Sequence, residues 1–164
     1  ALSSAASDVY KRQSVGSDMI VDVVAAIHEH PLPLVVIDMG TATTLSVADK
    51  KGNYIGGVIL PGLRVSLNSL SGKTAQLPYI SLEVPNKVIG KNTIDCMRAG
   101  IVFSNVDMID GILDRMEKEL GETPTVIATG GLARFITPLC RHEIIFDDAL
   151  LLKGLLILYR KNTQ

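Results

Sequence analysis

The segment LVVID, Leu34 to Asp38, constrains the fold of this chain more than any other stretch. It is a short, continuous apolar run with three β-branched residues, which is typical of a central strand buried on both faces. The chain has 164 residues, enough for one domain with a substantial core. The run ends on a carboxylate, and a turn of small and hydroxyl-bearing residues follows at once. The sequence therefore predicts a buried strand with an acidic side chain at its carboxyl end.

The segments around this strand predict the rest of the sheet. Residues 34–60 are predicted to form three sequential strands joined by tight turns, and a helix at 18–30 precedes them. We expect Pro61 to open a helix that runs to about Leu70, because proline is tolerated in a first turn. The later elements are expected as helix, strand, helix, strand and helix, at 93–120, 125–129, 130–139, 142–146 and 148–162.

This order resembles the ribonuclease-H-like layout, which is the building block of the actin, Hsp70 and sugar-kinase superfamily. The resemblance implies an α/β domain with a mixed sheet in the order βββαα and then βαβα. Its crossovers should be right-handed, with helices on both faces of the sheet. In such sheets, ligands lie at the carboxyl ends of the strands.

The longest helical signal spans residues 93–120, and Gly121 ends it as expected of a C-terminal cap. Its apolar residues recur at helical spacing and form a stripe, with charges on the other face. The stripe consists of Ile94, Met97, Ile101, Met108, Ile112 and Met116, and Val102, Ile109 and Leu113 lie beside it. It is wide enough to serve both a core and a dimer interface.

Composition and charge exclude several classes of function. The chain has 16 basic and 17 acidic residues, so no long basic surface for nucleic acid is expected. The longest apolar stretch, 149–159, is interrupted by Lys153 and Gly154 and is too short to cross a bilayer. Cys96 and Cys140 are isolated, and no signal peptide is recognised, so a cytoplasmic protein is expected.

Residues 1–13 (ALSSAASDVYKRQ) show no hydrophobic period and lead into no element. They resemble translated adaptor sequence, and we set them aside as non-native. The expected domain is therefore 14–164, and the chain is expected to be a fragment.

The turn after the first predicted strand suits the phosphates of a nucleotide. Gly40 is expected to permit a turn that a side chain would hinder. The backbone amides of this turn then face an anion, and the hydroxyls of Thr41, Thr43 and Thr44 donate to phosphate oxygens. Asp38 can hold a cation beside them, because hard cations prefer oxygen ligands. The alternative is a plain hairpin turn in which Asp38 caps local amides.

A second glycine pair, Gly130 and Gly131, follows a predicted strand and precedes a predicted helix. Glycines in this position let a ligand approach the backbone, and they expose a helix N-terminus. Two such turns at the strand ends of one sheet suggest one nucleotide held between them. A glycine pair alone is weak support, since many such pairs only turn the chain.

Taken together, the segments DMGTATT, PGLRVSLNSLSGKTAQLP, IGKNT, TGGLA and LKGLLILYRKN resemble type III pantothenate kinase. The resemblance covers residues 14–164 in the order of the family. It implies ATP-dependent phosphorylation of pantothenate to 4'-phosphopantothenate, the first step of coenzyme A biosynthesis. It also implies Mg²⁺ with ATP, K⁺ or NH₄⁺ as a monovalent cation, and a homodimer with pantothenate near the interface.

The same resemblance assigns roles to single residues. Asp18 stands where the family keeps its proton acceptor, and Asp38 stands at the ligand of the monovalent cation. Thr93 stands at a contact with pantothenate. The substrate motif is then Gly16, Ser17, Asp18 and Met19, and the implied ATP contacts are Gly40, Thr41, Thr43, Gly130 and Gly131.

The chain departs from the family pattern in two places. Met19 stands where the family commonly has an arginine, and a methionine cannot bind the carboxylate of pantothenate. The N-terminal D-x-G-N-T loop of the family is absent from this sequence. We therefore expect the chain alone to bind ATP weakly and to be inactive.

Two other functions remain open at this point. A non-catalytic accessory or regulatory relative of the same family could lack both the arginine and the D-x-G-N-T loop. Another ATPase of the superfamily, such as an actin-like protein, ranks lower, because it would lack the GKNT and PGLRVSLNSL segments.

Overall fold

The structure is a computed structural model that describes residues 16–73 and 80–163. The segment 1–13, set aside above, lies outside the described residues. The helices are α3 (Ser17–Glu29), α4 (Leu63–Lys73), α5 (Thr93–Leu120), α6 (Ala133–Ile136), the 3₁₀ turn η1 (Thr137–Leu139) and α7 (Leu150–Asn162). The strands are β1 (Leu34–Met39), β2 (Ala42–Ala48), β3 (Tyr54–Pro61), β4 (Thr125–Thr129) and β5 (Ile145–Phe146).

The strands form one mixed sheet in the order β3-β2-β1-β4-β5. β1, β2 and β3 pair antiparallel through tight turns, whereas β4 pairs parallel to β1 and β5 parallel to β4. A parallel return needs a crossover, and α4 and α5 supply it between β3 and β4. The predicted ribonuclease-H-like domain, with its βββαα and βαβα order, is confirmed.

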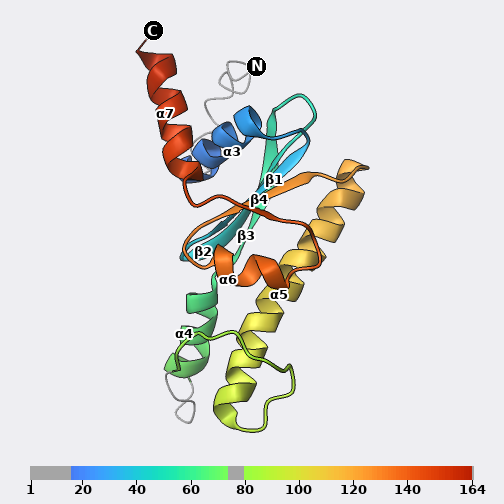
Figure 1. The fold of residues 1–164 in the computed structure, drawn as a ribbon, viewed down its shortest axis with the longest axis vertical. Coiled ribbons are helices and arrows are strands. Elements are labelled where there is room, and N and C mark those ends of the chain that lie inside the picture. Colours follow the sequence, from blue (N-terminus) through green and yellow to red (C-terminus); the bar gives the residue numbers. More distant parts are fainter. Residues whose placement is uncertain (1–15, 74–79, 164) are drawn as a thin grey trace.

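Helices cover both faces of the sheet, so β1 lies in the middle of three layers (Figure 1). Leu34 and Val36 pack with residues of α3 and α7 on one face. Val35 and Ile37 pack with residues of α4, α5 and α6 on the other face. All four side chains are almost completely buried, which is why this strand is a continuous apolar run.

The long helix α5 has the predicted bounds, but its buried face is rotated from the predicted stripe. Ile94 is exposed, and Met108, Ile112 and Met116 are only half-buried. Residues of the neighbouring row fill the core instead, and these are Val102, Val106, Ile109 and Leu113, together with Met97 and Ile101. The side chain of Asn92 accepts a hydrogen bond from the Asp95 amide at 2.9 Å and starts the helix. Gly121 ends it at φ 76°, as predicted.

Two boundary predictions are wrong for reasons that involve proline. Pro61 is the last residue of β3 and pairs with Ala42, so it does not open α4. β3 lies at the edge of the sheet, where the missing N–H of proline is tolerated. The helix expected at 130–139 is broken, because Pro138 has no N–H to continue the helical ladder and the chain tightens into η1.

α7 and α3 pack closely on the outer side of the sheet. Gly154 of α7 lies against α3, and a Cβ added to it would be 2.2 Å from the Val21 carbonyl oxygen. The Lys153 ammonium of α7 forms an ion pair with Glu29 of α3 at 2.8 Å, and a second ion pair with Asp147, in the segment before α7, at 2.7 Å. Among the described residues, no helix has both the length and the apolar character that a bilayer crossing requires.

A Gly154→Ala variant is expected to lose about 1–3 kcal/mol of unfolding free energy, because the added methyl group forces α7 away from α3. Gly100→Ala in α5 is the matched control, since an added Cβ there meets nothing within 4 Å. The control should gain about 0.5–1 kcal/mol, because alanine favours a helix over glycine. Urea denaturation followed by circular dichroism measures both, and equal stability of Gly154→Ala and the wild type would contradict the close packing.

Candidate functional site

The candidate site lies at the carboxyl end of β1, where the strand leaves the core. Asp38 is half-buried there and lies opposite Thr44 of β2 and Thr129 of β4 in the register of the sheet. Residues opposite each other share a face of the sheet, and Val36, two positions earlier on the same face, packs with α3 residues. The side chain of Asp38 is therefore on the α3 face.

Three carboxylates gather between α3 and the end of β1. Asp18 is exposed in the first turn of α3, and Asp22, one turn later on the same side of the helix, is only 3% exposed. Burial, with a further contribution from the negative charges of Asp38 and Asp18, raises the pKa of Asp22 to about 7. Burial and the charge of Asp18 also raise the pKa of Asp38. Asp18 and Asp38, to which the resemblance gives separate roles, therefore lie near enough to interact by charge, with Asp22 as a third member.

Sequence reasoning missed Asp22. Its Oδ1 atom is buried and has no hydrogen-bond partner among the described residues. Buried carboxylates are nearly always hydrogen-bonded, so this atom is an exception in the fold. The signal was present in the sequence as an aspartate inside an apolar helical face, four residues after Asp18.

The predicted phosphate turn divides between the two faces of the sheet. Gly40 and Thr41 are exposed in the turn between β1 and β2. Thr43 pairs with Met39 on the α5 face, is 1% exposed, and has an Oγ1 without a hydrogen-bond partner among the described residues. The structure therefore does not bring Thr43 together with Asp38.

The expectation that a side chain would hinder the turn at Gly40 is wrong. A Cβ added to Gly40 would make only ordinary contacts, the nearest at 3.7 Å from the Ala42 carbonyl oxygen. The crowded position is Gly62, at the start of α4, where an added Cβ would be 2.2 Å from the Thr41 carbonyl oxygen. The absence of a side chain at Gly62 thus allows the start of α4 to pack closely against the turn between β1 and β2.

The second glycine pair has two separate roles. Gly130 has φ +97°, and an added Cβ would be 2.7 Å from the backbone of Met39. It therefore lets the turn after β4 lie directly against the end of β1. Gly131 is exposed, and an added Cβ would meet nothing within 4 Å, so its backbone is open to a ligand. The helix that follows, α6, has only 4 residues.

An apolar cavity of about 270 Å³ lies on the α5 face beside these turns. Its walls come from α4, α5, α6 and the segment before α5, and they include Leu63, Val102, Leu132, Phe135 and Ile136. Leu63 follows Gly62 and Leu132 follows Gly131, so the cavity adjoins both turns.

The predicted substrate residues separate into two groups. Gly16 caps α3, and Ser17 donates a hydrogen bond to the Asp18 carboxylate at 3.2 Å, while Met19 is half-buried. Thr93 is exposed at the start of α5. Figure 1 shows α3 near the upper end of the molecule and the start of α5 at the lower end. Within one chain, Thr93 is therefore not brought to Asp18.

A cation at this site would have few protein ligands. Within 16–73 and 80–163, no group of three or more His, Cys, Asp and Glu side chains is placed to hold one metal ion. The three carboxylates thus interact by charge without forming a complete cage. A cation held by a carboxylate here would complete its coordination with other oxygen ligands such as water.

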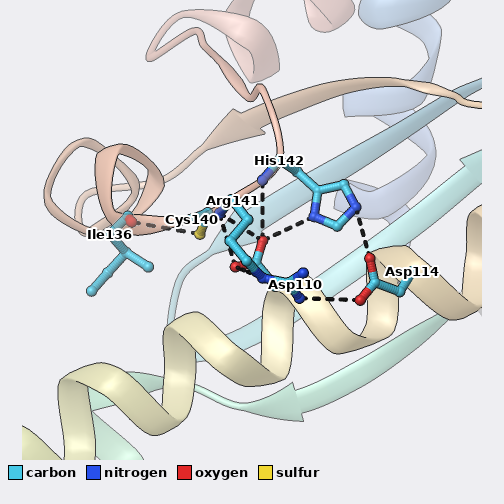
Figure 2. A network of polar contacts seen from close by, with 6 residues as sticks. All are labelled: Asp110, Asp114, Ile136, Cys140, Arg141 and His142. Carbon is cyan, nitrogen blue, oxygen red and sulfur yellow. Dashed lines mark hydrogen bonds and ion pairs between the residues drawn. The ribbon is translucent and has the colours of Figure 1, made fainter.

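A second polar cluster lies on α5 and the segment after η1 (Figure 2). The Asp110 carboxylate is 1% exposed and accepts hydrogen bonds from the Arg141 amide at 2.9 Å and from His142 Nδ1 at 2.9 Å. The other ring nitrogen of His142 lies 3.2 Å from Asp114. Burial alone would raise the pKa of Asp110, but these hydrogen bonds lower it below its usual value. The cluster fastens the segment to α5 and borders a cavity of about 370 Å³ at the amino end of β4, away from Asp38.

Asp22→Asn is expected to stabilise the chain at about pH 8 and to have little effect near pH 4. The pKa of Asp22 is about 7 in the folded chain against 3.8 for a free side chain, so wild-type stability falls as the pH rises between these values. Above pH 7, this loss lowers the unfolding free energy of the wild type by on the order of 4 kcal/mol relative to low pH, and Asp22→Asn does not lose it. Thermal melts in EDTA buffer measure it. An equal pH dependence in the variant and the wild type would contradict the assignment.

Comparison with known proteins identifies the family of the chain. The profile of the type III pantothenate kinase family matches residues 5–115, a stretch that begins within the segment set aside above. A type III pantothenate kinase of Bacillus cytotoxicus is 43% identical over 150 residues. The alignment covers 92% of this chain, which spans 57% of the length of that relative.

Two solved structures share the fold. The crystal structure of a Baf family protein from Campylobacter jejuni has a TM-score of 0.61 at 22% identity, covering 87% of this chain and 64% of that one. The Alp12 filament structure also has a TM-score of 0.61, at 11% identity, covering 90% of this chain and 53% of that one. These similarities concern the fold alone. By the profile match and the identity to the Bacillus enzyme, the chain belongs to the type III pantothenate kinase family.

Proposed function

We propose that the whole protein transfers a phosphoryl group from ATP to pantothenate and forms 4'-phosphopantothenate, the first step of coenzyme A biosynthesis. The observation that carries the proposal is that Asp38, at the carboxyl end of β1, lies on the face of the sheet covered by α3, whose first turn carries Asp18. Both are residues that the family resemblance marks for chemistry, and they come from different elements. This chain then supplies the half of the site that holds the acceptor hydroxyl.

Asp18 is the proton acceptor in this proposal. It is exposed at the first turn of α3, where a bound alcohol can reach it. Phosphoryl transfer passes through a loose transition state, so the proton leaves the hydroxyl late. A weak base in the right position is sufficient for this task.

ATP occupies the edge of the sheet between the turns after β1 and β4. The exposed residues Gly40 and Thr41 lie beside its phosphates in this proposal, and the open backbone at Gly131 lies on the adenosine side. Mg²⁺ accompanies the nucleotide and neutralises phosphate charge when bound. Asp38 holds a further cation, which the family resemblance gives as K⁺ or NH₄⁺.

A homodimer is part of this proposal, because Thr93 and Asp18 lie far apart in one chain. A second copy can bring its own Thr93 to a shared pantothenate site. The segment around the start of α5 supports such an interface, since it exposes apolar side chains to solvent. Val88 is 67% exposed, Ile89 84% and Ile94 41%.

A second candidate is a non-catalytic relative of the family, and Met19 is the observation that favours it. Its thioether cannot form the ion pair that an arginine would make with the carboxylate of pantothenate. Such a protein would bind nucleotide without transferring its phosphate.

Pantothenate-dependent release of ADP by the full-length product of the gene tests the proposal. We expect turnover with Mg²⁺, and a loss on the order of 10²–10⁴-fold in kcat for Asp18→Asn, because the proton acceptor is removed. Glu29→Gln, on the same helix but ion-paired to Lys153, is the control and should keep its activity. ATP binding without turnover in the wild type would favour the non-catalytic candidate.

Met19→Arg should lower the KM for pantothenate about tenfold or more, because a guanidinium adds a charge-assisted hydrogen bond to the substrate carboxylate. Met19→Leu is the control, since it keeps an apolar side chain of similar volume. Steady-state kinetics of the full-length variants measure the effect. Equal KM values for the two variants would show that position 19 does not face the carboxylate.

A further inference from the structure

The side of α7 that faces away from α3 exposes more large apolar side chains than any other element of the described residues. Leu152 is 69% exposed and Tyr159 is 67% exposed, and Leu155 and Leu156 between them are half-exposed. Positions 152, 155, 156 and 159 recur at helical spacing, so these four side chains form one stripe along the helix. We call this stripe the outer face of α7.

The opposite side of α7 is already buried. Leu150 packs in the core beside residues of α3, and Gly154 lies directly against the backbone of α3. Between Leu150 and Tyr159 the sequence has one charged residue, Lys153, whose ammonium is ion-paired with Glu29. A helix that is apolar on all sides is normally buried on all sides. The outer face therefore has the composition of a covered surface, although it is exposed in this structure.

The length of the relatives indicates what covers this face. The chain spans 57% of the length of the Bacillus relative, so a protein of this family has a substantial further part that must pack against this domain. The dimer proposed above uses the segment around the start of α5, and Figure 1 shows that segment at the lower end of the molecule and α7 at the upper end. A two-fold dimer buries the same patch on both copies, so the second copy lies away from α7.

We propose that the outer face of α7 is the surface on which the remaining part of the full-length protein docks. The inference rests on membership of the family and does not depend on the proposed reaction. The docking surface is expected to be apolar and to offer the Tyr159 hydroxyl a hydrogen-bond partner, because a buried tyrosine hydroxyl needs one. Since Gly154 seats α7 directly on α3, the docked part is also held in place relative to the helix that carries Asp18.

Photo-cross-linking of the full-length product of the gene tests the inference directly. A photoreactive benzophenone amino acid replaces Tyr159, and the linked peptides are identified by mass spectrometry after irradiation. We expect a link within a single polypeptide, from position 159 to a peptide that lies outside the 164 residues of this chain.

Thermal melts of full-length variants provide a second measurement that needs no bulky probe. Leu152→Gln should lower the Tm by about 4 °C or more, because a covered leucine loses its apolar contacts while glutamine forms helix as well as leucine does. Leu152→Met is the matched control and should keep the Tm within roughly 2 °C, since it conserves volume and apolar character.

Two results would overturn the inference. A cross-linked product with twice the mass of the chain would assign the outer face to a second copy. An unchanged Tm in Leu152→Gln would show that the face is open, because an uncovered leucine can be replaced without loss. Neither measurement contains pantothenate, so a protein that forms the internal link and fails to phosphorylate pantothenate would keep this inference and lose the proposed function.

Discussion

The burial of β1 between two helical layers is the constraint on which the rest of the structure depends. From Leu34 to Ile37 both faces of the strand are covered, so no polar side chain can be accommodated there without a partner. Asp38 is the first position at which the strand reaches solvent on one side. The location of the candidate site therefore follows from packing. Asp38 lies where the buried part of this face ends, and α3, the helix that covers this face, carries Asp18 and Asp22.

Two buried aspartates in this fold have opposite environments, and the contrast separates structure from function. Asp110 receives hydrogen bonds from the backbone and the ring of the segment at Arg141 and His142, and its pKa is lowered. Asp22 receives none at Oδ1 from the described residues, and its pKa is raised. A satisfied carboxylate fastens two parts of a chain together. An unsatisfied one beside other acids is a common property of sites that bind or react.

The sequence predicted most of the fold, because its elements have strong and unambiguous periods. The bounds of α5 and its glycine cap followed directly from helical spacing and from the turn chemistry of Gly121. The buried row of α5 and the turn glycine were misassigned, since both depend on what packs against them. Thr43 illustrates the same limit, because only the pairing of Met39 with Thr43 reveals which face its side chain takes. Asp22 was missed because the sequence does not show whether an acidic residue within an apolar helical stripe is buried, or which other charges lie near it.

The backbone contact at Gly130 has a mechanical consequence. Because the backbone of Gly130 lies directly against that of Met39, the turns after β1 and β4 form one continuous surface. The backbone of Gly62, at the start of α4, lies close to the carbonyl oxygen of Thr41 in the same turn. Moving either turn outward alone would break these close backbone contacts, so the two turns present a ligand with one joint surface. In the proposed function, a nucleotide therefore binds to a surface whose shape is already set by these backbone contacts.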